Sequence, residues 1–190
     1  MYKLNDKRIR TSLIKKLKKQ STKPKAVIEE LRVHNGNAIA DVVALYNEAH
    51  CFEIKGDTDK VERISEQGYY YDTSFRKITL VTTQKHLRKA LLLAPSYWGI
   101  MVAGFKNREV VLKYVRGAKR NFNFNKQLAL LTLWKSEMLL LTEDESANKS
   151  GINRNKLAEI ISNCEEKEKL SKLISTQLLI RHQNTFISSY

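Results

Sequence analysis

The stretch from residue 39 to residue 83 limits most strongly what this chain can fold into. Two apolar, β-branched runs, residues 39–46 and 51–55, are separated by four residues, which is the pattern of a β-hairpin. A helical pattern follows over residues 60–71, and a β-rich run covers residues 77–83. A strand, a helix and a strand of these lengths predict a right-handed crossover with parallel strands. We therefore expect an α/β fold with a mixed sheet.

The rest of the sequence predicts one helical segment before the α/β core and another after it. We expect a basic N-terminal helix in residues 1–25, an α/β core in residues 26–125, and a helical segment in residues 126–190 that packs on the core. The expected helices are 3–20, 25–33, 84–93, 125–142, 155–163 and 168–182, and the further strands are 98–103 and 109–115.

Charge is distributed unevenly along the 190 residues, whose formal net charge is +14. Residues 1–25 hold ten Lys or Arg and one acid, and residues 76–125 hold eleven and one. Residues 26–75, which lie between these two basic segments, hold four Lys or Arg and ten acids. Residues 126–190 hold nine Lys or Arg and eight acids. Solubility alone is one interpretation. The other is a protein that binds a polyphosphate with basic surface and a divalent metal with carboxylates.

Several classes of protein are disfavoured by composition. Two Cys are too few for a disulfide scaffold, and Cys and His show no zinc-ligand spacing. The longest apolar runs are far shorter than a membrane span, and the basic N-terminus is not followed by a continuous apolar segment. We expect a cytoplasmic protein with DNA as its partner and no membrane association. A homo-oligomer or an accessory protein is a possible further partner.

Three ionisable residues fall in the predicted hairpin. Glu53 and Lys55 share one face of their strand because side chains alternate, and a hairpin of suitable register brings Asp41 beside Glu53. The three could point into solvent from a one-sided sheet, with a cross-strand ion pair. If helices cover both faces, however, a cluster of ionisable groups among apolar neighbours indicates a functional site.

The spacing of these residues resembles the signature of the PD-(D/E)XK nuclease superfamily. Asp41 is followed, after eleven residues, by Glu53-Ile54-Lys55, and Glu30 matches an acidic residue that such enzymes often carry on the preceding helix. Ala40 stands where the signature has Pro. The resemblance covers residues 29 to about 103 and implies a restriction-endonuclease-like mixed central sheet flanked by helices, with a C-terminal helical segment.

The next predicted helix carries a second motif. Gln67 and Tyr71 form a Q-x-x-x-Y pattern that resembles the motif of RecB-like exonucleases, within a branch found in bacteria and phages. Residues four apart share a helix face, and Arg63 lies next to that face. The resemblance implies that Gln67, Tyr71 and Arg63 bind the substrate.

The resemblance also implies a mechanism. Asp41 and Glu53, with Glu30 and the carbonyl of Ile54, would hold Mg²⁺, for which Mn²⁺ would substitute. Lys55 would orient or deprotonate the attacking water and stabilise the transition state, so that Asp41, Glu53 and Lys55 are the catalytic residues.

Three functions remain open at this point. The first is a Mg²⁺-dependent DNA nuclease that hydrolyses phosphodiester bonds and processes DNA ends in repair, recombination or phage DNA metabolism. The second is a DNA-binding protein on a nuclease-like fold that does not cut. The third is a regulatory protein whose basic faces bind an acidic protein.

Overall fold

Residues 3–142 and 151–187 are described by a computed structural model of the chain. Within these ranges, six strands form one sheet, and their order in the sheet is their order in the sequence. The strands are β1 (Ala26–Val33), β2 (Ala38–Leu45), β3 (Ala49–Lys55), β4 (Lys77–Thr83), β5 (Gly99–Lys106) and β6 (Glu109–Arg116). The helices are α1 (Asp6–Lys19), α2 (Ile64–Ser74), α3 (Leu87–Leu93), α4 (Lys126–Leu130), α5 (Lys135–Leu139), α6 (Arg154–Cys164) and α7 (Lys167–Ile187), with short 3₁₀ turns η1 (His34–Gly36) and η2 (Val61–Arg63).

The sheet is mixed, as the sequence predicts. β1, β2 and β3 are antiparallel to one another, β3, β4 and β5 run parallel, and β6 is antiparallel to β5. Val42 pairs with Phe52 in the predicted hairpin, and Phe52 pairs with Thr79 across the parallel β3–β4 ladder. α2 makes the connection between these two parallel strands, which confirms the predicted crossover.

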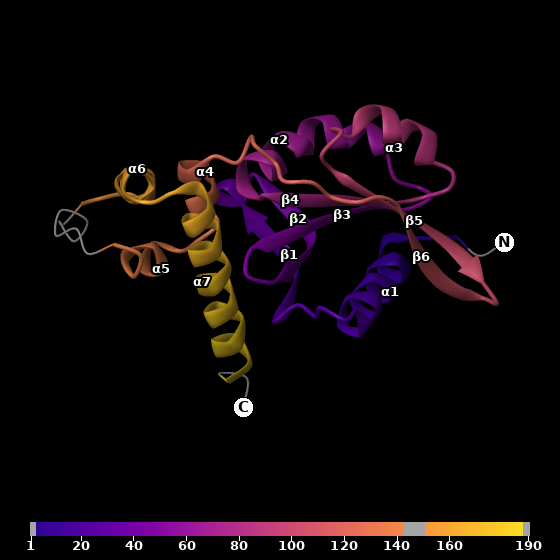
Figure 1. Cartoon of the computed structure of the whole chain (residues 1–190), viewed down its shortest axis with the longest axis horizontal. Helices are drawn as coiled ribbons and strands as arrows, with labels where there is room; N and C mark the ends of the chain where they lie inside the picture. Colours follow the sequence, from indigo (N-terminus) through magenta and orange to yellow (C-terminus); the bar gives the residue numbers. More distant parts are fainter. Residues whose placement is uncertain (1–2, 143–150, 188–190) are drawn as a thin grey trace.

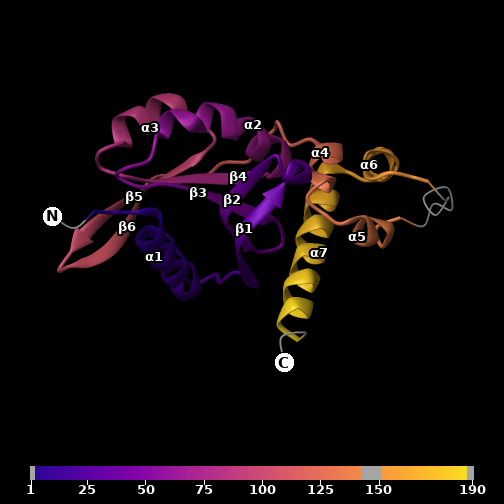
Figure 2. The ribbon, with the colours of Figure 1, turned by 180° about the vertical axis from the view of Figure 1, so that it is seen from behind.

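Helices cover both faces of the sheet (Figures 1 and 2). On one face, Leu13 of α1 packs in a core with Val42 and Phe52. On the other, α2 and the C-terminal helices share a core with Val43 and Cys51. Neighbouring residues of β2 and β3 thus enter different cores, and a charged side chain on either strand is surrounded by apolar layers.

The helix expected over residues 25–33 is wrong, because this segment forms β1. Ala26 pairs with Leu45 of β2, and the antiparallel register continues to Val33 and Ala38. The apolar side chains of Val27, Ile28 and Leu31 suit one side of a short helix, but β-branched residues suit a strand equally. Pairing with β2 satisfies backbone groups along one side of the segment, except at Glu30, and this non-local contact decides the conformation.

The single long helix expected over residues 125–142 is also wrong. The chain forms two five-residue helices, α4 and α5, with a turn between them. In that turn the guanidinium of Arg154 donates to the carbonyl oxygens of Leu131 and Leu133, at 2.6 and 2.5 Å. A continuous helix would use these carbonyls in its own hydrogen bonds, so a donor 20 or more residues away replaces the local partners.

The C-terminal helices pack on the same core as the sheet. Ile161 of α6 and Leu170 and Leu178 of α7 belong to the cluster that contains Val43. Figure 1 shows α7 crossing beside β1, with α5 and α6 at the end of the molecule farthest from the N-terminus. In the described ranges, none of the helices combines the length and the apolar character that crossing a membrane requires.

Candidate active site

The glutamate and lysine of β3 form a buried ion pair. Glu53 and Lys55 expose only 1% and 6% of their surface, and both side chains lie on the face that α2 covers. Lys55 Nζ lies 2.5 Å from Glu53 Oε1 and donates a second hydrogen bond of 2.8 Å to Gln67 Oε1. Burial of a charge is costly unless it is paired and hydrogen-bonded. These contacts bring Gln67 of the Q-x-x-x-Y pattern to the Glu53–Lys55 pair.

The tyrosine of the Q-x-x-x-Y pattern is inside the protein. The hydroxyl of Tyr71 donates to the carbonyl of Ile39 at 2.9 Å, and Gln67 Nε2 lies 3.5 Å from the same hydroxyl. Burial, and then the nearby charge of Glu53, raise the pKa of Tyr71. Tyr71 thus fixes α2 against β2 and orients Gln67. Arg63 lies exposed in η2, one helical turn before Gln67, and among the described residues neither Glu53 nor Lys55 forms a hydrogen bond or ion pair with it.

Asp41 lies where the β1–β2 ladder is interrupted. Pairing holds at Glu29 with Val42 and at Leu31 with Ala40, but Glu30 and Asp41 between them do not pair. Glu30 has a φ of 54°, a left-handed conformation that is uncommon for residues other than glycine. The break lets both strands turn their acidic side chains toward α1.

The carboxylate of Asp41 is tied to the E-x-K strand by the backbone. Asp41 Oδ2 accepts a 2.7 Å hydrogen bond from the amide of Ile54, which lies between Glu53 and Lys55. The β2–β3 register, extended by one pair, also places Asp41 opposite Glu53. The three residues of the predicted catalytic set therefore lie together at one point of the sheet.

The site holds more negative charge than its internal cation balances. Burial, followed by repulsion from Glu53, raises the pKa of Asp41 to about 7. Glu53 Oε2 is buried and has no hydrogen-bond partner among the described residues. An unsatisfied buried carboxylate oxygen beside a second carboxylate is an arrangement that a bound cation would stabilise.

Glu30, the third expected metal ligand, is held away from this pair by an arginine that sequence reasoning missed. Glu30 exposes 66% of its side chain, and Arg10 of α1 binds it at 2.8 Å. Arg10 also binds Asp6 at 2.9 Å and lies 3.7 Å from both Glu29 and Asp41. The i, i+4 spacing of Asp6 and Arg10 was the only visible signal of this cluster, and it does not reveal that β1 and β2 supply the other carboxylates.

The carboxylates expected to bind Mg²⁺ form only a small set. Within the described ranges, no group of three or more His, Cys, Asp or Glu side chains is arranged to hold a metal. Mg²⁺ commonly binds one or two carboxylates and completes its shell with water and substrate phosphate. Asp41 and Glu53 are the two carboxylates to compare with this requirement: Asp41 binds the amide of Ile54 and faces Arg10 of α1, Glu53 faces α2, and Glu30 is held by Arg10.

The fold and the site together define an α/β protein whose mixed sheet carries a buried acid-x-lysine pair beside an aspartate. The chain belongs to the bacteriophage P4 protein cII family, whose model matches residues 2–188. It is 25% identical over 183 residues to protein cII of Enterobacteria phage P4, covering 96% of this chain and 69% of that protein. No solved structure matches the chain.

Proposed function

We propose that the chain is a Mg²⁺-dependent nuclease that hydrolyses phosphodiester bonds in DNA, with a catalytic centre of the PD-(D/E)XK type. The observation that carries this proposal is the contact set of Asp41, Glu53 and Lys55, in which Glu53 keeps one buried oxygen without a partner. The net charge of +14 supports a polyphosphate substrate.

Each residue has a distinct part in the proposed reaction. Asp41 and Glu53 would hold the metal, which supplies charge neutralisation at the scissile phosphate and lowers the pKa of its bound water. Lys55 has three ammonium donors, two of which bind Glu53 and Gln67. Its third donor is left for the attacking water or a phosphate oxygen, where it would stabilise developing negative charge.

Gln67 and Tyr71 would act mainly by positioning. Gln67 accepts from Lys55 and contacts the Tyr71 hydroxyl, which itself is anchored to the carbonyl of Ile39. This chain of contacts fixes the direction of the Lys55 ammonium group. Arg63, exposed at the start of α2, remains available for contact with a DNA phosphate.

A DNA-binding protein without turnover is the alternative, and one observation favours it. Asp41 Oδ2 binds the amide of Ile54, and Asp41 Oδ1 lies 3.7 Å from the guanidinium of Arg10. Both oxygens thus have partners within the protein. In that case Arg10 would take the place of a metal as the cation that stabilises the carboxylate.

The two functions are separated by incubating the purified chain with linear, circular and single-stranded DNA in Mg²⁺, Mn²⁺ or EDTA. We expect metal-dependent cleavage that is lost in Asp41→Asn and Glu53→Gln. Glu62→Gln is the matched control, because it removes an exposed carboxylate from the same region. DNA binding without cleavage in every metal would reject the nuclease and support the alternative.

A further inference from the structure

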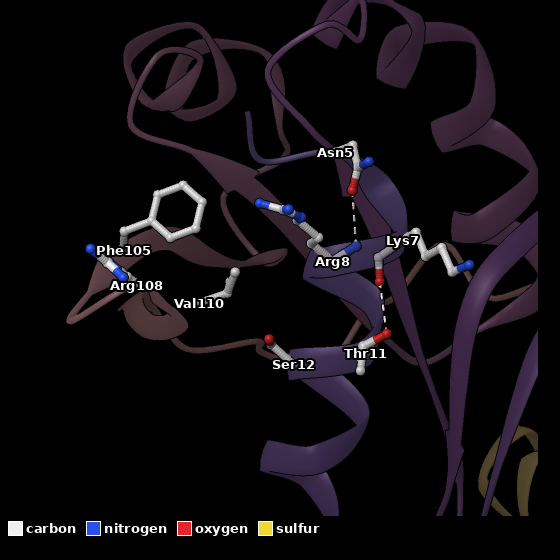
Figure 3. Close-up of a pocket in the computed structure, with 8 residues that line it drawn as sticks. All are labelled: Asn5, Lys7, Arg8, Thr11, Ser12, Phe105, Arg108 and Val110. Atoms are coloured by element: carbon white, nitrogen blue, oxygen red, sulfur yellow. Dashed lines mark hydrogen bonds between the residues drawn. The ribbon is translucent and has the colours of Figure 1, made fainter. Parts of the chain in front are cut away.

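A groove lies between α1 and the hairpin of β5 and β6 (Figure 3). Its volume is about 590 Å³, and Lys7 and Arg8 of α1 line one side while Arg108 lines the other. Figure 3 shows that the hydroxyl of Thr11 and the side chain of Asn5 are turned to the backbone of α1. The figure also shows that Arg8 extends toward the hairpin, whereas Lys7 extends its ammonium group away from the hairpin.

A second hollow continues the groove along the same helix. Its volume is about 660 Å³, and it shares Thr11, Ser12 and Val110 with the first. We call the two together the helix–hairpin groove. Its lining contains six cations, Lys7, Arg8, Lys15, Lys16, Lys19 and Arg108, and one carboxylate, Glu109.

Most of this positive charge is not neutralised within the protein. Lys7, Lys15, Lys19 and Arg108 take part in none of the ion pairs formed by the described residues. Arg10, on the same helix, contacts four carboxylates. Like charges held close together without partners repel one another. A bound polyanion would neutralise them and relieve this repulsion, so the groove favours such a ligand.

The cations of α1 that line the groove are spread along this helix from Lys7 to Lys19. The 14 residues of α1 span about 21 Å, at a rise of ~1.5 Å per residue. A row of cations of this length runs along several consecutive phosphates of a nucleic-acid strand rather than binding one isolated anion.

We propose that the helix–hairpin groove binds the phosphodiester backbone of DNA. The proposal does not rest on the proposed nuclease function, because binding of the backbone needs no cleavage. The lining combines the cations with the apolar side chains of Phe105, Val110, Val111 and Leu112. Contacts from cations to phosphates position a nucleic acid without reading its base sequence.

The test compares two variants that lose the same charge. Lys15→Gln/Lys19→Gln/Arg108→Gln removes three cations from the groove. The control, made at Lys135, Lys156 and Lys169 with Gln at each position, removes three exposed cations from α5, α6 and α7. Both proteins are first checked for an unchanged circular dichroism spectrum and melting temperature.

DNA affinity is then measured by fluorescence anisotropy in EDTA, with single-stranded and duplex DNA at several salt concentrations. We expect the groove variant to bind on the order of 100-fold more weakly at 0.1 M salt, while the control changes by less than about twofold. The slope of log K against log salt should become shallower by about 2 for single strands or by about 3 for duplex. The arm with the larger loss identifies the strand form that the groove binds.

Three results would overturn the proposal: equal weakening in both variants, unchanged binding in the groove variant, or groove-dependent binding of poly-glutamate without binding of DNA. The last would indicate an acidic protein partner. If the parent cuts no DNA but groove-dependent binding persists, the nuclease fails and the groove proposal stands.

Discussion

Lys55 is expected to stabilise the fold as well as to act in the site. Lys55→Met leaves the carboxylate of Glu53 buried, with 1% of its surface exposed and without its cation. Removing one member of a buried ion pair typically costs about 3–5 kcal/mol, because the remaining charge is desolvated and uncompensated. The second hydrogen bond of Lys55, to Gln67, is lost as well.

A loss of this size is a large part of the stability of an average domain, which is about 5–15 kcal/mol. The double variant Glu53→Gln/Lys55→Met removes both charges, so it should recover most of the loss. The difference between the single and double variants then measures the cost of the uncompensated carboxylate.

The assay is urea denaturation at pH 7, followed by circular dichroism, for the parent, both single variants and the double variant. Lys89→Met is the matched control, since Lys89 pairs with an exposed carboxylate on the surface, and its midpoint should not change. A Lys55→Met protein within about 1 kcal/mol of the parent would show that Glu53 is not held as a buried anion. The reasoning on the site would then be wrong.

Three further predictions concern the site and its supports. Because burial and Glu53 raise the pKa of Asp41 to about 7 from 3.8, the folded chain holds a proton that the unfolded chain releases. In EDTA the free energy of unfolding should therefore fall as pH rises from about 4 to about 7, and Asp41→Asn should flatten this slope in denaturation curves. Asp72 accepts a 2.8 Å hydrogen bond from the buried indole of Trp98, so Asp72→Ala should cost about 1–3 kcal/mol in urea unfolding, and an unchanged midpoint would contradict this. A Cβ at Gly99 would lie 2.9 Å from the backbone nitrogen of Ala118, so Gly99→Ala should lower the melting temperature at a cost of about 1–3 kcal/mol, and a higher one would refute the packing argument.

The fold class could be predicted because its signals are local. The hairpin of β2 and β3, the crossover through α2 and the strand β4 follow from patterns within 45 residues of sequence. The two errors arose where distant contacts outweigh local preference. Residues 25–33 pair with β2, and the carbonyls at Leu131 and Leu133 bind Arg154 in place of helical partners.

The candidate site divides in the same way. Alternation along β3 places Glu53 and Lys55 on one side of the sheet, and helical spacing places Gln67 and Tyr71 on one side of α2. Both pairs could therefore be predicted from the sequence. The contact between the pairs, through Lys55 and Gln67, depends on how α2 packs over β3.

By itself the sequence determined which residues share a face, because a strand or a helix repeats with a fixed period. Only the tertiary structure decided that Asp41 sits at a break in the ladder, that Tyr71 is inside, and that Arg10 binds Glu30. Each of these features depends on how two elements pack together, through the register of paired strands or the angle of a helix on the sheet. The relative placement of these elements is set by packing across the whole core, and the periodicity of a single strand or helix does not encode it.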